Sequence, residues 1–281
     1  MLVAGLLFSC MGVLIKYGSS QFSTSELVFY RSVFGLLILY AMLHRSKITL
    51  STQHWRSHLW RGLSGTIAMM LFFYCIRVLP LATAITLNYT SSLFISALTV
   101  VVLKEKFHIP LSSALAVGFI GVVLLLHPTL AHDQLLPGLL GLLSGLFAAV
   151  ALLNVRHLGV LGEPGTRVVF YFNLIAALAS GAWMLTDPLQ MITLSDLPLL
   201  VSIGATATFA QLAMTRAYRT GQTLVVGSLA YSTIVFSALF GLLFWHELLS
   251  LGAWFGIALI IASGMLSLRL APTHTDTEAS K

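Results

Sequence analysis

The sequence predicts an all-α integral membrane protein whose ten transmembrane helices form two inverted five-helix repeats. Two features of composition predict the membrane environment: 58% of the 281 residues are hydrophobic and only 9% are charged, with a mean hydropathy of +0.94. Soluble domains carry about 25% charged residues, and a soluble protein this apolar would leave large hydrophobic patches in water. A third feature, an internal repeat at an offset of 142 residues, predicts the inverted arrangement.

Ten apolar segments separated by turn signals give the individual helices. A spanning helix needs about 20 mostly apolar residues at a rise of 1.5 Å each. Proline, glycine and charged residues mark the breaks, as in Glu163-Pro164-Gly165. The polar residues 271–281 are expected to form a disordered cytoplasmic tail. The predicted helices cover residues 2–18, 25–43, 58–78, 81–103, 110–127, 137–156, 166–186, 196–216, 222–245 and 250–269.

The placement of lysine and arginine predicts the orientation in the membrane, because cytoplasmic loops carry an excess of these residues. With the N-terminus inside, Lys16 and Arg77 lie outside, Arg31 lies within the second helix, and the other twelve of the fifteen lie inside. Both termini are therefore expected in the cytoplasm, with the protein in a bacterial inner (plasma) membrane. The inner charges are Arg45, Lys47, Arg56, Arg61, Lys104, Lys106, Arg156, Arg167, Arg216, Arg219, Arg269 and Lys281.

Net charge and cysteine content weigh against other classes of protein. The net charge of +6 would suggest nucleic-acid binding in a soluble chain, but here it is attributed to the cytoplasmic loops. Cys10 and Cys75 are the only cysteines and both lie in apolar segments, so neither a disulfide framework nor a thiol metal site is predicted.

The internal repeat appears when the chain is aligned with itself. Residues 87–94, LNYTSSLF, fall on residues 229–236, LAYSTIVF, and no gap is needed from Gly62 to Leu126. Shared leucines mean little in so apolar a chain, so the rarer residues carry the alignment. The matched pairs include Gly62 with Gly204, Thr66 with Thr208, Arg77 with Arg219, Tyr89 with Tyr231, Phe94 with Phe236 and Glu105 with Glu247.

Each copy has an odd number of helices, so the two copies insert with opposite topology. The expected units are residues 1–129 and 136–270. In transporters built in this way, the binding site lies near the middle of the membrane, at the interface between the repeats. A site between the two units is therefore expected here.

The motifs LPLATAITLNYTSSLFISALTVVVLKEKF, ALAVGFIGVVLLL and, upstream, SELVFYRSVFGLLIL resemble the EamA branch of the drug/metabolite transporter superfamily. The resemblance covers essentially the whole chain, and it implies a transporter fold without naming the substrate. The stretch RGLSGTIAMMLFFYCIRVLPLATA is also similar to members that take up S-adenosylmethionine. The second copy departs from the pattern, because Gln222 stands opposite Pro80 and Phe172 opposite Arg31. A fully symmetric site is not expected.

Polar side chains within the apolar segments are the candidate substrate-cavity residues, because a polar group in lipid without a partner costs several kcal/mol. For serine and threonine hydroxyls the alternative is a bond to a carbonyl of their own helix or a contact that joins two helices. The amide of Asn88 and the phenols of Tyr89 and Tyr231 need partners beyond their own helix, and the two tyrosine rings would also pack on a ligand. The predicted cavity residues are Arg31, Asn88, Tyr89, Ser92, Asn154, Tyr171, Gln211, Tyr231 and Ser232.

Three charged residues receive separate interpretations. Arg31 lies about 9 Å beyond Ser25 at helical rise, and an intramembrane charge is by default a functional hypothesis. Its guanidinium would attract a carboxylate or phosphate, or else extend outward and bind neighbouring carbonyls. Glu105 and Glu247 close the fourth and ninth helices, where each is expected to anchor a loop by pairing with nearby cations or helix N-termini.

No carboxylate lies in the middle of a predicted helix, so a proton relay of the usual carboxylate kind is not predicted. The sequence also contains no Walker motif and no GxSxG or HExxH motif. We therefore expect no cofactor, no ATP drive and no enzymatic activity. The predicted function is a secondary transporter of small metabolites, such as amino acids or related amphiphiles, that works by alternating access around a central cavity. The expected partners are a small-molecule substrate and the lipid bilayer, without nucleic acid, in a monomer or homodimer.

Two other functions remain open at this point. An integral-membrane enzyme acting on lipid substrates would need catalytic acids or histidines at one interface, where Glu105 and His108 are the nearby pair. A scaffold or sensor without transport activity would have no water-filled cavity between the halves.

Overall fold

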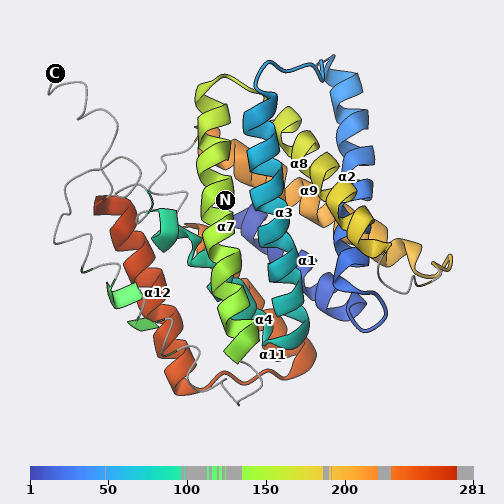
Figure 1. Cartoon of the computed structure of the whole chain (residues 1–281). Coiled ribbons are helices and arrows are strands. Elements are labelled where there is room, and N and C mark those ends of the chain that lie inside the picture. The colour runs from blue at the N-terminus through green and yellow to red at the C-terminus, as the bar shows by residue number, and fades with distance from the viewer. Residues whose placement is uncertain are drawn as a thin grey trace, which may run out of the picture.

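The computed structural model describes residues 1–47, 49–95, 98, 113, 116–118, 120, 121, 124, 135–185, 190, 192–220 and 229–270. Every regular element among these residues is an α-helix. The predicted fifth helix lies largely outside the described residues, as do Glu105, His108 and the tail over residues 271–281. The helices are α1 (Leu2–Gly18), α2 (Thr24–Ser46), α3 (Trp55–Val78), α4 (Leu81–Tyr89), α7 (Leu135–Val160), α8 (Gly165–Met184), α9 (Leu197–Thr220), α11 (Ser232–Trp245) and α12 (Leu251–Leu270) (Figure 1).

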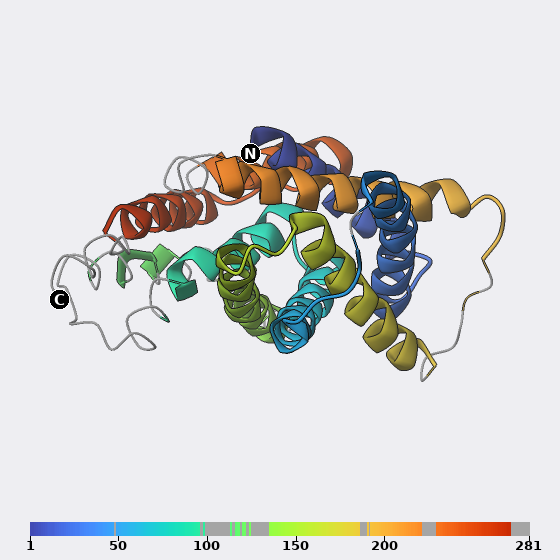
Figure 2. The same cartoon turned by 90° about the horizontal axis from the view of Figure 1, so that it is seen from above.

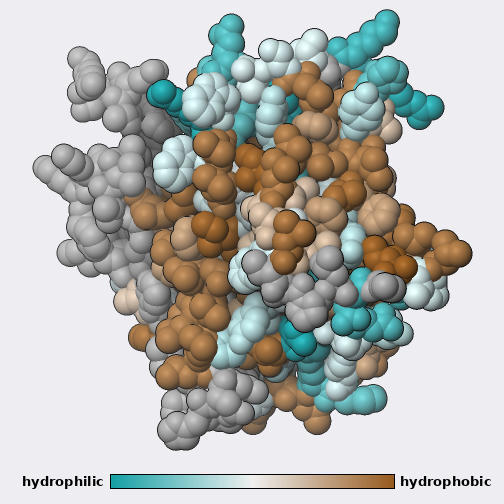
Figure 3. All heavy atoms as spheres, turned by 45° about the vertical axis from the view of Figure 1, so that its right-hand side comes forward, coloured by the Kyte–Doolittle hydropathy of each residue, from teal (hydrophilic) through white to brown (hydrophobic). Residues whose placement is uncertain are grey.

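The surface and helix lengths are those of an integral membrane protein. Within the described residues, α2, α3, α7, α8 and most of α9 are long and apolar enough to cross a membrane, and the remaining helices are shorter apolar segments. Figure 3 shows a broad hydrophobic belt with hydrophilic residues gathered toward the upper and lower ends of the face in view. Large apolar side chains stand exposed, such as Leu37 at 60% and Leu178 at 66%. A soluble protein would not leave such a belt in water.

The start of α2 is fixed by its sequence. Ser23 and Glu26 form a capping box, in which the Glu26 backbone N–H donates to Ser23 Oγ and the Ser23 backbone N–H donates to Glu26 Oε2 at 2.8 Å. Two of the donors that a helix leaves free at its N-terminus are thereby satisfied. Glu26 is fully buried, and its Oε1 also accepts from the Gln190 backbone N–H at 2.9 Å, which ties α2 to the chain before α9.

The helices of the two halves of the chain interleave. Each of the first three helices packs against a helix of the second half: α1 against α9, α2 against α8, and α3 against α7. Between them, α4 contacts both α7 and α11. Seen from above, α12 extends to one side of the other helices (Figure 2). We name the two ends of the bundle by their links: the α2–α3 end is uppermost in Figure 1, and the α3–α4 end is lowermost.

The close contact between α4 and α7 depends on glycine. A Cβ at Gly145 would lie 2.5 Å from Thr90 Oγ1 and 2.8 Å from the Leu87 backbone oxygen. Gly141, one turn earlier, meets the Leu87 side chain in the same way. Small residues one turn apart let helix backbones approach closely in membranes, and they do so here.

The predicted helix over residues 81–103 is not continuous as far as it is described. The first segment, α4, ends at Tyr89, Thr90 forms a turn, and helical conformation resumes over residues 91–95. The physical reason is local: Thr90 Oγ1 donates to the Leu87 backbone oxygen at 2.6 Å, and such bonds compete with the hydrogen bonds of the helix itself.

The second half has a similar interruption. A turn at Tyr231 precedes α11, which begins at Ser232, whereas a continuous helix was predicted from residue 222. Residues 221–228 lie outside the described part of the chain. Thr233 Oγ1 donates to the Ala230 backbone oxygen at 2.8 Å, as Thr90 does in the first half.

Candidate functional site

Tyrosine and hydroxyl side chains meet where α4 and α11 contact each other. The hydroxyl of Tyr89 lies 2.8 Å from Thr233 Oγ1, and the hydroxyl of Tyr231 is hydrogen-bonded to Ser92 Oγ. The rings of Tyr89 and Tyr231 lie 6.2 Å apart between centroids. Tyr231 is buried and Tyr89 packs against the core beside it, so both rings lie inside the bundle. We call Tyr89, Ser92, Tyr231 and Thr233 the tyrosine seam.

A second polar group gathers around the ring of Phe172, which α8 carries. The Cζ atom of Arg31 lies 5.5 Å from the ring centroid, and the Cζ atom of Arg61 lies 4.2 Å from it. Arg31 Nη1 donates to Asn173 Oδ1 at 3.2 Å. Arg31 is 2% exposed and Arg61 is 7% exposed, so both guanidinium groups lie in the interior. We call Arg31, Arg61, Phe172 and Asn173 the arginine cluster.

Sequence reasoning missed Arg61, which was counted only as a cytoplasmic charge near the start of the helix predicted over residues 58–78. It lies instead one to two turns inside α3, with its side chain within the bundle. Gly65 makes room for it, because a Cβ there would contact Arg61 Nη1 and lie 2.9 Å from Phe172 Cε2. The available signal was the run of small residues that follows Arg61, which leaves one helical face open.

Three other predicted cavity residues lie apart from these two groups. Asn88 Nδ2 donates to Ser144 Oγ at 3.2 Å and thus joins α4 to α7. Asn154 Nδ2 donates to the Val150 backbone oxygen of its own helix at 2.9 Å. Ser232 Oγ donates to the Leu229 backbone oxygen at 2.7 Å. Ser232 therefore makes the bond to its own chain that was the alternative interpretation for hydroxyls. Asn154 also bonds its own helix, which the sequence analysis did not anticipate for this amide.

The last two predicted residues occupy different environments. Gln211 is buried on α9, and its Oε1 has no hydrogen-bond donor among the described residues. Tyr171 lies at the α2–α3 end, where its hydroxyl donates to the Leu50 backbone oxygen at 2.7 Å and its ring lies 4.6 Å from that of His58. Tyr171 thus belongs to the end of the bundle, separate from the tyrosine seam.

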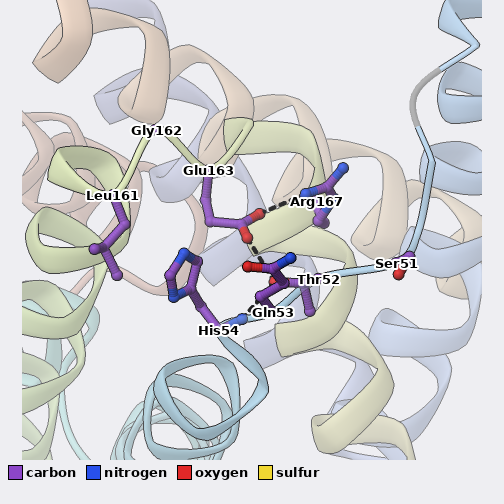
Figure 4. Close-up of a pocket in the computed structure, with 8 residues that line it drawn as sticks. All are labelled: Ser51, Thr52, Gln53, His54, Leu161, Gly162, Glu163 and Arg167. Atoms are coloured by element: carbon purple, nitrogen blue, oxygen red, sulfur yellow. Dashed lines mark hydrogen bonds and ion pairs between the residues drawn. The ribbon is translucent and has the colours of Figure 1, made fainter.

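A pocket of about 260 Å³ opens at the α2–α3 end, between the α2–α3 link and the α7–α8 link (Figure 4). Glu163 organises it: Thr52 Oγ1 donates to Oε1 at 2.5 Å, and Arg167 Nη1 donates to Oε2 at 2.8 Å. His58 Nε2 lies 3.6 Å from the same Oε2. The lining residues are Ser51, Thr52, Gln53, His54, Leu161, Gly162, Glu163 and Arg167.

The environment of Glu163 favours its ionised form. Burial by itself raises the pKa of this carboxyl, but hydrogen bonds from Thr52 and Arg167 and the charges of Arg167 and His58 outweigh it, so the pKa lies below its ordinary value. The sequence showed Glu163 only as part of a turn. Its partner Thr52 is 111 residues away, and no local pattern indicates such a contact.

The opposite, α3–α4 end carries a second charged contact. Lys16 Nζ forms an ion pair with Glu247 and donates to the Leu79 backbone oxygen at 3.1 Å. Glu247 Oε2 also accepts from the Leu81 backbone N–H at 2.8 Å, at the start of α4. The prediction that Glu247 pairs with a cation and a helix N-terminus is confirmed, although the terminus is that of α4 rather than that of the following helix.

The comparisons with known proteins agree with one another. The model of the EamA-like transporter family matches residues 1–127 and 136–269. The chain is 31% identical over 264 residues to the pseudopaline exporter CntI of Pseudomonas aeruginosa (strain UCBPP-PA14), covering 94% of this chain and 90% of that protein. A riboflavin transporter of Vibrio cholerae is 29% identical over 94% of this chain and 89% of its own length.

The chain is also similar, at lower identity, to a further transporter and to a solved structure. An S-adenosylmethionine uptake transporter of Rickettsia bellii is 25% identical, covering 90% of this chain and 86% of that protein. A solved crystal structure matches with a TM-score of 0.69 at 20% identity, over 96% of this chain and 95% of that chain, which shows a shared fold. From the family match and these relatives, the chain belongs to the EamA-like transporter family of membrane proteins.

Proposed function

We propose that the protein is a secondary transporter that moves a small metabolite across the membrane by alternating access, without ATP and without enzymatic turnover. The observation that carries the proposal is that a charged contact joins the two halves of the chain at each end of the bundle. At the α3–α4 end Lys16 pairs with Glu247, and at the α2–α3 end Thr52 binds Glu163. Buried polar side chains lie between these ends.

Contacts of this kind suit alternating access because each can break while the other holds. The Lys16–Glu247 ion pair is partly buried, and the Thr52–Glu163 contact is a single hydrogen bond to a carboxylate, so each contributes modestly. A few kcal/mol of substrate binding is then enough to shift the balance between the two ends. Opening the α3–α4 end requires Lys16 to leave Glu247, and opening the α2–α3 end requires Glu163 to release Thr52. The interior that holds the tyrosine seam and the arginine cluster would then open first to one side of the membrane and afterwards to the other.

The proposed architecture is two inverted five-helix repeats, residues 1–129 and 136–270. The helix neighbours support it, because exchanging the halves turns the pairing of α1 with α9 into that of α3 with α7. Tyr89 and Tyr231, which the repeat aligns, also face each other. By the distribution of positive charge, we place the α2–α3 end and both termini in the cytoplasm of a bacterium, with the protein in its inner membrane.

The substrate class that we propose is amino acids or related small amphiphiles. Relatives are named for pseudopaline, riboflavin and S-adenosylmethionine, which supports a metabolite as the cargo. These names include both an exporter and uptake transporters, so the proposal concerns exchange across the membrane in either direction.

Reconstitution with reversible locking tests this proposal. Purified protein in proteoliposomes is assayed by counterflow of labelled amino acids, riboflavin and S-adenosylmethionine. In a background with Cys10→Ser and Cys75→Ser, Lys16→Cys with Glu247→Cys is joined by a reducible bis-methanethiosulfonate cross-linker. We expect cross-linking to abolish exchange and reduction to restore it.

A pair at the other end, Thr52→Cys with Glu163→Cys, should behave in the same way, because transport needs both ends to open. Either single cysteine variant treated with the same reagent is the control. The proposal fails if no solute across the panel exchanges, or if cross-linking either end leaves the exchange rate unchanged.

A further inference from the structure

We infer that Arg31 and Arg61 together form the binding site for a carboxylate group of the transported molecule. The inference rests on the proposed transport function and adds the chemical class of the substrate to it. The site lies inside the bundle, on α2, α3 and α8, and so draws on both halves of the chain.

The first argument is charge. Two cations that both contact Phe172 lie buried together, and neither pairs with a carboxylate anywhere in the described part of the chain. Burying a charge is costly unless it is paired and hydrogen-bonded, and like charges side by side add to that cost. The face of Phe172 offers each guanidinium a cation–π contact, which offsets only part of it. An anion would supply the missing partner.

The second argument is hydrogen bonding. Arg31 Nε, Arg61 Nε, Arg61 Nη1 and Asn173 Nδ2 are buried and have no acceptor among the described residues. Buried donors without acceptors are rare in native structures and call for a specific explanation. A carboxylate offers about four lone-pair sites on two oxygens, which matches this set of unused donors. The cluster is therefore short of an acceptor, which a carboxylate supplies.

The third argument is the shape of the groups. Guanidinium is planar and binds a planar carboxylate through two parallel hydrogen bonds, which is why arginine recognises carboxylates selectively. Arg31 and Arg61 approach the ring of Phe172 from different helices. Asn173 Oδ1 accepts a hydrogen bond from Arg31 Nη1, which fixes the position of that guanidinium. Gly65 leaves the room that the Arg61 side chain needs. The donors are thus held in position before the ligand arrives.

The first test needs no variant. The midpoint of thermal unfolding of the purified protein in detergent is measured with sodium acetate, succinate or glutamate, against sodium chloride and sodium phosphate at equal ionic strength and against neutral succinamide. We expect at least one carboxylate to raise the midpoint in proportion to the logarithm of its concentration. At 100 times the dissociation constant, the unfolding equilibrium constant should fall about 100-fold. Equal shifts with chloride, a larger shift with phosphate, or an equal shift with succinamide would overturn the inference.

Matched variants then locate the effect. Arg61→Gln and Arg31→Gln should lose the carboxylate shift, whereas Arg56→Gln, which removes an exposed arginine of the same helix α3, should keep it. Arg61→Lys retains the charge without the fork and should recover only part of the shift, which a purely structural role would not predict. A carboxylate shift that persists in both glutamine variants refutes the assignment.

These results separate the inference from the proposed function. Exchange of a solute in proteoliposomes without any arginine-dependent carboxylate shift would refute the carboxylate site and leave transport standing. An arginine-dependent shift without exchange of any solute would leave the anion site standing and refute transport.

Discussion

The contact between α4 and α7 gives a stability prediction that can be worked out from the structure. In Gly145→Ala the new methyl group would lie 2.8 Å from the Leu87 backbone oxygen and 2.5 Å from Thr90 Oγ1. A backbone atom cannot rotate away, so the two helices must separate by some tenths of an ångström. Overpacking a fitted interior costs about 1–3 kcal/mol, and the better helix propensity of alanine returns about 1 kcal/mol. We expect a net loss of up to about 2 kcal/mol.

The matched control is Gly159→Ala in the same helix. Gly159 is exposed, and a Cβ there would meet nothing within 4 Å. Only the propensity term of up to about 1 kcal/mol then remains, and it is stabilising. The propensity gain is common to both variants, so they should differ by the overpacking cost alone, roughly 1–3 kcal/mol. At about 2–4 °C per kcal/mol, the value for a large domain, this corresponds to roughly 2–12 °C in the midpoint of thermal unfolding.

Differential scanning fluorimetry of the two purified variants in one detergent measures this difference. Equal midpoints, or a Gly145→Ala protein more stable than Gly159→Ala, would show that α4 and α7 do not approach as closely as described. Counterflow on the same preparations would then report whether this contact also matters for exchange.

Three further predictions concern the polar contacts. Because the pKa of Glu163 lies below its ordinary value, its contribution to stability is present above that ordinary value and is lost as pH falls through the lowered pKa. Glu163→Gln should thus flatten the acid side of the melting midpoint plotted against pH, whereas an unchanged acid slope would contradict the pairing with Arg167, Thr52 and His58. Glu247→Gln weakens the contact with Lys16 and should cost about 1–3 kcal/mol by thermal unfolding, while Asp196→Asn, which alters only local bonds from Thr193 in the turn before α9, should cost less than that. Tyr231→Phe removes the hydroxyl that bonds Ser92 and should cost about 1 kcal/mol; the exposed Tyr40→Phe serves as the reference, and equal midpoints for the two would count against a buried seam.

The sequence predicted the helices better than their interior contacts. Apolar length alone placed most described helices within a few residues of their observed ends, as for α1 and α8. The repeat aligned Tyr89 with Tyr231 and both were predicted to line one cavity, and their rings lie 6.2 Å apart between centroids. Glu247 was expected to meet a cation, since a glutamate at a helix end in an apolar chain has few other stable partners.

The sequence did not show where individual side chains point, nor which residues far apart in the chain contact each other. Arg61 was counted as a cytoplasmic charge near the start of the helix predicted over residues 58–78, because a count of positive charges registers position along the chain and not where a side chain points. The turn at Thr90 arises where the Thr90 hydroxyl donates to the backbone oxygen of Leu87, three residues earlier. Any threonine in a helix can form such a bond, so the sequence alone does not mark this one. Glu163 binds Thr52 across 111 residues, so neither residue reveals the contact locally.

The contacts Arg31–Phe172 and Tyr89–Tyr231 each join positions that the internal repeat aligns, with consequences for how such a chain can diverge. A dimer of two identical half-length chains would have to place the same side chain on both sides of its axis. Two tyrosines tolerate that, but two arginines would repel each other. Fusion into one polypeptide removes this constraint, because a mutation then alters one side only. An aromatic ring can in this way come to face a cation, and an asymmetric, selective site can evolve from a symmetric one.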